Sequence, residues 1–317
     1  MRRLEFSGKF FLSLVSTLFL FVSGVMAPPV GVALLPFVPQ PVLVFGLRYG
    51  TVWGLAVLLV AAILLAVLAA EELALIYGLF ALVAALLLVF LGRLRKIEFL
   101  VLTVASVVSA VTGGLSLYFF GSWAGMIQDL RESLMYQLTA AMRVHEKMGF
   151  PQDSLELVRE RAPQIVETLL QLLPALFFVS LSVIVLINVL LLCRRFPERR
   201  SEWLSVGNLR EWKGPEPMVW ALIVSGFALF IPGIEWLRTF AVNVLVVIGA
   251  CYFAQGLAII GYFFHKNNVP RFLRGVTYLL IFLQQIFTLL VVGLGLFDLW
   301  GDFRRLRKDN LNPSQVS

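Results

Sequence analysis

The sequence predicts an all-α, polytopic membrane protein: a bundle of eight or nine transmembrane helices with an amphipathic helical hairpin on the extracytoplasmic side. Composition is the first reason, since 60% of the 317 residues are hydrophobic, 14% are charged, and the mean hydropathy is +0.90. Soluble domains are about 45–50% apolar and about 25% charged. Apolar runs of about 20 residues, long enough to cross a bilayer as a helix, recur along most of the chain. Lys and Arg gather in short clusters between these runs, as the positive-inside rule requires.

Each apolar run is bounded by charge, Gly or Pro, which marks the ends of a candidate span. We expect spans at 10–26, 30–47, 51–69, 73–91, 98–120, 167–192, 217–236, 240–264 and 275–298. The first follows a basic segment and so resembles a signal peptide. Pro28 and Pro29 disfavour cleavage after it, and we therefore expect an uncleaved first span.

The second run is the weakest span because it is rich in proline, at Pro28, Pro29, Pro36, Pro39 and Pro41. Proline has no backbone N–H, so it leaves helix carbonyls unpaired. Lipid cannot satisfy these groups, and such a segment persists in a membrane only where protein covers it or where it lines a cavity. We therefore predict that the stretch from Pro28 to Pro41 is not a regular lipid-facing helix.

The basic clusters orient the chain. Residues 2–9, 93–96 and 194–200 carry them, and all three are expected in the cytoplasm. This orientation places residues 121–166 outside. Three further spans would then leave the basic segment 304–308 outside as well, against the rule. Either one of the last three segments does not cross, or a late span violates the rule.

The long polar segment, 121–166, has the pattern of two helices. Apolar residues recur at near-helical spacing with charges between them, at Met126, Leu130, Leu134, Leu138 and Met142. Gly149-Phe150-Pro151 interrupts the pattern, and Asp153 or Ser154 can cap a second helix that runs toward Pro163. We therefore divide the chain into an N-terminal membrane bundle, an extracytoplasmic insert, a C-terminal membrane bundle and a basic, polar tail, at 1–120, 121–166, 167–303 and 304–317.

Polar side chains inside the spans are the first candidates for a site, because they are costly in lipid unless they face the interior. They are the amides Asn188, Asn243, Gln255 and Gln284. Hydrogen bonding between helices explains such amides without a ligand. Gln255 is the most interesting of them, because its neighbour Gly256 leaves room for a ligand or another backbone.

The C-terminal end of the last span is a second candidate site. Asp298 and Asp302 are four residues apart, on one helix face, and Arg304 follows them. The alternative interpretation is a helix end that Trp300 anchors at the membrane interface, with a local ion pair.

Patterns for catalysis, a cofactor or a metal site are not found in the sequence. His145 and His265 lack the spacing of metal ligands. Cys193 and Cys251 lie far apart in or beside apolar stretches, where we interpret them as buried small hydrophobes. The formal charge of +7 sits at segment ends, which indicates membrane topology and not a nucleic-acid partner. We therefore predict a protein that is not an enzyme and has no cofactor.

Four motifs follow one another along the chain: a Pro-rich stretch ending in Leu47-Arg48-Tyr49-Gly50, the insert opening near Ile127 to Met135, Gln255-Gly256-Leu257, and Gly295-Leu-Phe-Asp298 to Asp302-Phe-Arg304. By these motifs, in this order, the chain resembles the YybS-like family of uncharacterised bacterial membrane proteins. The resemblance implies a multi-pass protein of the bacterial cytoplasmic membrane and supplies no activity.

The N-terminal half contains Pro39-Gln-Pro41 and then three small residues that let helices approach closely, Gly46, Gly50 and Gly54. By these residues it also looks like the substrate-binding subunits of energy-coupling-factor transporters and the rod-shape protein MreD. It is a likeness of fold. The chain departs from the binding subunits by its additional spans and its outer insert.

Two functions remain open from the sequence, besides a less favoured membrane-embedded enzyme. The first is a non-enzymatic protein that binds a small solute or lipid within its bundle, as a transport component or accessory. The second is a structural or interaction protein of the cell envelope, with the hairpin or the basic loops as docking surfaces. The expected partners are the lipid bilayer and either a small-molecule ligand or a membrane or envelope protein. A cavity lined by the polar residues of the spans would favour binding.

Overall fold

The structure is a computed structural model that describes residues 2–27, 31, 33–69, 71–149, 151–205 and 209–304. The chain divides into two compact units. Unit 1 comprises Met1–Gly114 and Ser180–Gly207, and unit 2 comprises Leu115–Val179 and Asn208–Ser317. These bounds differ from those of the four parts expected from the sequence. The division into those four parts remains a prediction.

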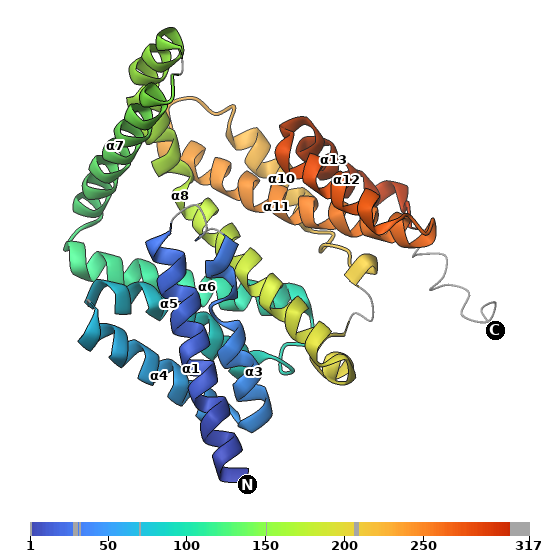
Figure 1. Cartoon of the computed structure of the whole chain (residues 1–317). Helices are drawn as coiled ribbons and strands as arrows, with labels where there is room; N and C mark the ends of the chain where they lie inside the picture. The colour runs from blue at the N-terminus through green and yellow to red at the C-terminus, as the bar shows by residue number, and fades with distance from the viewer. Residues whose placement is uncertain are drawn as a thin grey trace, which may run out of the picture. The chain divides into compact units, whose positions relative to one another are not determined.

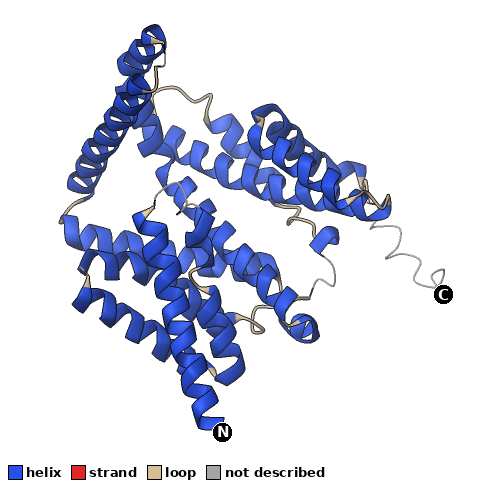
Figure 2. Ribbon diagram, in the orientation of Figure 1, coloured by secondary structure: helices blue, strands red, loops and turns tan. Residues whose placement is uncertain are grey.

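Every element of regular structure in the described residues is a helix, so the all-α class is confirmed (Figure 2). The first group of helices is α1 (Arg2–Met26), η1 (Leu35–Phe37), α3 (Gln40–Tyr49), α4 (Thr51–Leu68), α5 (Glu71–Phe90) and α6 (Ile97–Phe120). Next come α7 (Trp123–Lys147), α8 (Gln152–Arg195), η2 (Pro197–Arg199), α9 (Arg200–Trp203) and η3 (Leu209–Glu211). The last are α10 (Met218–Ala228), α11 (Glu235–Lys266), α12 (Arg271–Leu283) and α13 (Gln285–Gly301).

Six helices of the described residues are long and apolar enough to cross a membrane, namely α1, α4, α5, α6, α8 and α11. The consecutive helices α12 and α13 pass the same test only as a pair, which gives up to seven. The chain is thus a multi-helix membrane protein by length and composition. The predicted count of eight or nine spans is not confirmed, because three of the predicted runs are not single long helices.

Two of these three runs lie near the C-terminus. The run 217–236 forms the 11-residue α10 and then a turn at Pro232 and Gly233, whose φ of +82° favours glycine. The run 275–298 is divided between α12 and α13, which are bent by 103° at Gln284. Gln284 has extended backbone angles, φ −112° and ψ 113°, so the helix cannot continue through it.

The third run is the proline-rich one, and its described residues are broken as predicted. They form the short η1 and then α3, which begins at Gln40. Two of the carbonyls in this segment receive hydrogen bonds from other helices. Asn188 Nδ2 donates to the Pro36 carbonyl at 2.9 Å, and Thr17 Oγ1 donates to the Val38 carbonyl at 2.8 Å. Residues 28–30 and 32 of the predicted stretch from Pro28 to Pro41 lie outside the described residues.

Small residues let α3 and α4 pack closely in unit 1, as the sequence predicts for Gly46 and Gly54. The Cα atom of Gly46 lies 3.0 Å from the position that a Cβ on Gly54 would take. Gly50, between the two helices, has a φ of +112°, which a residue with a side chain rarely adopts. The three glycines thus shape this corner.

The polar insert forms two helices, α7 and the first part of α8, on either side of a turn at Gly149, whose φ is +81° (Figure 1). An ion pair of 3.0 Å between Arg131 and Glu167 joins them. The second helix does not end near Pro163, because α8 is continuous over 44 residues with Pro163 and Pro174 inside it. The expected boundary between insert and sixth span at 166–167 therefore lies within a helix. The extracytoplasmic side of the insert remains a prediction.

Candidate functional site

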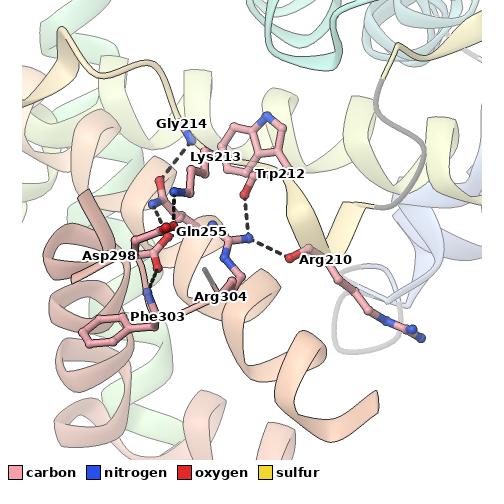
Figure 3. Close-up of polar contacts among 9 residues, drawn as sticks. Arg210, Trp212, Lys213, Gly214, Gln255, Asp298, Phe303 and Arg304 are labelled. Atoms are coloured by element: carbon pink, nitrogen blue, oxygen red, sulfur yellow. Dashed lines mark hydrogen bonds and ion pairs between the residues drawn. The ribbon is translucent and has the colours of Figure 1, made fainter. Parts of the chain in front are cut away.

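A buried polar cluster in unit 2 brings Gln255 together with the C-terminal motif (Figure 3). We call it the Asp298 cluster; it comprises Gln255, Asp298, Asp302, Arg304 and the segment 210–214. Gln255 lies on α11 and Asp298 on α13. The sequence nominated these residues as two separate sites, and the structure makes them one.

Two glycines explain why α11 and α13 come close enough for these contacts. A Cβ on Gly256 would overlap the carbonyl oxygen of Val291, and a Cβ on Gly295 would overlap that of Tyr252. The backbones of the two helices therefore touch. This contact places the side chains of Gln255 and Asp298 on the same side of the crossing.

The carboxylate of Asp298 is fully buried and accepts three hydrogen bonds. Arg304 Nη2 donates to Oδ2 at 2.7 Å, Gln255 Nε2 donates to the same oxygen at 3.3 Å, and the Phe303 backbone N–H donates to Oδ1 at 3.0 Å. Burying a charge is costly unless it is paired and hydrogen-bonded. Both conditions are met for this carboxylate.

Arg304 and Gln255 also hold the segment 210–214 against the helices. Arg304 Nη1 donates to the carbonyls of Arg210 at 2.6 Å and Trp212 at 3.0 Å. Gln255 Oε1 accepts the Gly214 backbone N–H at 3.0 Å. At the edge of the cluster, Lys213 Nζ pairs with Asp302 Oδ1 at 2.6 Å. Chemically, the cluster fastens a loop to a helix pair, and both ends of the Gln255 amide are used for this.

The other three amides lie elsewhere. In unit 1, Asn188 is fully buried, and its Nδ2 donates to the Pro36 and Ile184 carbonyls. In unit 2, the side chain of Asn243 binds two backbone groups of α8 that are four residues apart. Its Oδ1 accepts the Ala175 N–H at 2.8 Å, and its Nδ2 donates to the Gln171 carbonyl at 2.7 Å.

Gln284 is exposed at the bend between α12 and α13 and does not join the Asp298 cluster. The four amides therefore do not converge on one pocket. Asn188 binds the carbonyl of Pro36, and Asn243 binds the N–H of Ala175, which follows Pro174. Whether any of the amides binds a ligand remains a prediction.

Unit 1 contains a groove that is large enough for a small molecule. Its volume is about 740 Å³, and we call it the basic groove. It is lined by Lys9, Leu12, Ser13, Ser16, Phe37, Gln40, Pro41, Val44, Phe45, Arg48, Tyr49, Leu191, Arg194 and Arg195. These side chains come from α1, η1, α3 and the last turns of α8. The groove combines four cationic side chains with an aromatic and aliphatic wall.

The sequence contained a signal for the basic groove that topology alone does not use. On α1, Lys9, Leu12, Ser13 and Ser16 recur at helical spacing and give the first span one partly polar face. On α3, Gln40, Val44 and Arg48 recur four apart. The basic clusters 2–9 and 194–200 indicate the cytoplasmic side, and basic loops can also be docking surfaces, but neither interpretation predicts a groove between helices.

A comparison of the sequence with protein-family models gives one match. The family is described as "Predicted membrane protein (DUF2232)", and its model matches residues 15–299. Neither the curated proteins nor the solved structures give a match to the chain. The family match agrees with a membrane protein and does not address the narrower likeness to the YybS-like family, to energy-coupling-factor subunits or to MreD.

Proposed function

We propose, from the premise that the chain belongs to the DUF2232 family of predicted membrane proteins, that it binds an amphipathic small molecule in the basic groove. In this proposal the protein is a non-enzymatic transport component or accessory of the bacterial cytoplasmic membrane. The observation that supports it is the lining of the groove. Cationic, hydroxyl and amide groups face one space together with aromatic and aliphatic side chains, and a volume of this size is typical of small-molecule sites.

Mass spectrometry of the protein purified in mild detergent tests this proposal, because it identifies the small molecules that remain bound. The matched variants are Ser16→Trp, which fills the groove, and Phe11→Trp, which changes a residue of the same helix that is 66% exposed and outside the groove. Overpacking costs about 1–3 kcal/mol, so Ser16→Trp should lower occupancy about tenfold or more. Phe11→Trp should leave occupancy unchanged.

Equal occupancy in both variants would contradict a site in the groove. If a second protein co-purifies in a fixed ratio and no small molecule does, the scaffold function is the better one. Thermal stability of both variants in detergent separates a lost ligand from a lost fold.

A further inference from the structure

The four cations of the basic groove come from three helices and lie at helix ends that the topology places together. Lys9 is near the start of α1, Arg48 is in the last turn of α3, and Arg194 and Arg195 end α8. The start of α1 contacts the end of α3, since the rings of Phe6 and Tyr49 are 5.4 Å apart. By the positive-inside rule, this end of the groove is at the cytoplasmic surface, at the level of the lipid headgroups.

The charge of these side chains is not compensated within the described part of the chain. None of the four cations forms an ion pair there, and the groove lining contains no Asp or Glu. Arg48 lies over the face of the Phe196 ring, at 5.5 Å from its centroid. The positive-inside rule explains cations at helix ends, but it does not require that three helices direct them into one groove.

The remainder of the groove is suited to hydrocarbon. Leu12, Phe37, Val44 and Leu191 line it together with Phe45. The lining also includes Ser13, which is 6% exposed and whose hydroxyl has no hydrogen-bond partner among the described residues. A small inorganic anion would leave this wall unused, whereas a lipid uses both parts.

We infer that the basic groove binds an anionic phospholipid of the cytoplasmic leaflet, with its phosphate between Lys9, Arg48, Arg194 and Arg195 and an acyl chain along the apolar wall. This inference rests on the proposed function and names its ligand. Basic pockets between transmembrane helices on the cytoplasmic side are suited to such headgroups.

Native mass spectrometry of the full chain tests the charge preference. The protein is mixed with equal amounts of phosphatidylglycerol and phosphatidylcholine of the same chain lengths, and the first bound lipid is counted. The test variant is Lys9→Gln with Arg48→Gln. The matched control is Arg93→Gln with Lys96→Gln, which removes two exposed cations of unit 1 outside the groove.

The wild type and the control should bind phosphatidylglycerol first. Each basic group near an anionic lipid contributes roughly a fivefold preference, so the test variant should lose about thirtyfold of it. Unchanged preference in the test variant, or an equal loss in the control, would overturn the inference. Displacement of the lipid by millimolar inorganic phosphate would also overturn it, because the ligand would then be a soluble anion.

The groove-filling variant separates this inference from the proposed function. If Ser16→Trp loses bound lipid of both kinds while the wild type shows no preference for the anionic one, the groove binds an amphiphile and the charge inference alone fails. If Ser16→Trp binds lipid as the wild type does, the groove is not the site, and both fail.

Discussion

Both the oxygen and the nitrogen of the Gln255 amide form hydrogen bonds within the protein. Its oxygen accepts the Gly214 N–H and its nitrogen donates to Asp298. A ligand at this position would have to replace both bonds. The structure therefore favours the interpretation of Gln255 as a link between helices and loop over its interpretation as a ligand contact.

Replacement of Gln255 by leucine should destabilise the protein. Gln255→Leu leaves the buried Gly214 N–H without an acceptor and removes one donor from Asp298, and an unsatisfied buried group costs about 1–3 kcal/mol. Thermal unfolding in detergent, followed by size-exclusion chromatography, measures the loss. Gln284→Leu is the control and should unfold with the wild type, because Gln284 is exposed. If Gln255→Leu unfolded with the wild type but lost a bound molecule, Gln255 would be part of a binding site.

At the scale of single residues, the sequence predicted which side chains matter better than how they pair. The chemistry of a buried amide and of two acids four apart is visible in the sequence. The pairing of Gln255 with Asp298, 43 residues away, depends on how α11 and α13 cross. Lys213 and Gly214 were missed, since nothing in a loop sequence indicates that it will bind Asp302 and Gln255, which lie far along the chain.

The crossing of α11 and α13 is the element-scale feature on which the Asp298 cluster depends. It requires a residue without a Cβ at Gly256 and at Gly295. Close approach through small residues is a common way to pack helices in membranes, where lipid tails compete with larger apolar side chains. Two other glycines of these helices are not equivalent to them, because Gly249 and Gly293 have open space where a Cβ would go.

Replacement of these four glycines by alanine should distinguish the steric effect of close helix packing from the effect of helix propensity. Gly256→Ala and Gly295→Ala force the helices apart and should each cost about 1–3 kcal/mol or more. Gly249→Ala and Gly293→Ala should be neutral or stabilise by up to about 1 kcal/mol, because alanine has the higher helix propensity. Thermal unfolding of the four variants in one detergent checks the order. Equal effects within each helix would exclude a steric cause.

Most long helices could be predicted from hydrophobic runs, and the exceptions have identifiable causes. Gln284 interrupts a continuous apolar run without Pro or Gly nearby, so periodicity gives no warning of the bend. Conversely, α8 continues through Pro163 and Pro174, although proline commonly ends a helix. At Pro174 the side chain of Asn243 supplies hydrogen bonds beside the interruption, and that contact is tertiary.

The insert formed by α7 and the start of α8 should be extracytoplasmic, because basic clusters before and after it mark the cytoplasm. Single cysteines at Glu146 and Gln152, in a variant that lacks Cys193 and Cys251, allow this to be measured in intact cells. A membrane-impermeant maleimide should label both positions without permeabilisation. Labelling only after permeabilisation would reverse the orientation.

At the scale of the whole molecule, the Asp298 cluster bears on the topology of the last segments, where three crossings after Arg200 would violate the positive-inside rule. Arg304 and Asp302 bind residues of the segment 210–214. That segment follows the basic residues 194–200, which are expected in the cytoplasm. With that orientation, we expect the chain to return to the cytoplasmic side by residue 304, and the segments after Arg200 to cross an even number of times. The 103° bend between α12 and α13 is the place where one of them can turn back.

A reporter at the C-terminus should confirm this arrangement. Green fluorescent protein fused after Ser317 should fluoresce, and alkaline phosphatase at the same position should be inactive, because both results require a cytoplasmic location. The same pair of fusions in the insert, after Gln152, should give the opposite result. An active phosphatase at Ser317 would mean three crossings after Arg200 and a violation of the positive-inside rule.

The Asp298 cluster also sets an order on biosynthesis. Gln255 is synthesised 43 residues before Asp298. At a synthesis rate of roughly 5–20 residues per second, the carboxylate that binds the Gln255 amide is therefore added about 2–9 seconds later. During that time the polar groups of α11 and of the loop before α10 lack their partners in the cluster, and we expect such a chain to be open to proteolysis. We expect a chain that ends after Phe297 to be degraded quickly, and one that ends after Arg304 to persist like the full chain. Pulse-chase labelling measures the lifetimes of the two chains. Equal lifetimes would show that the cluster does not protect the newly made chain from degradation.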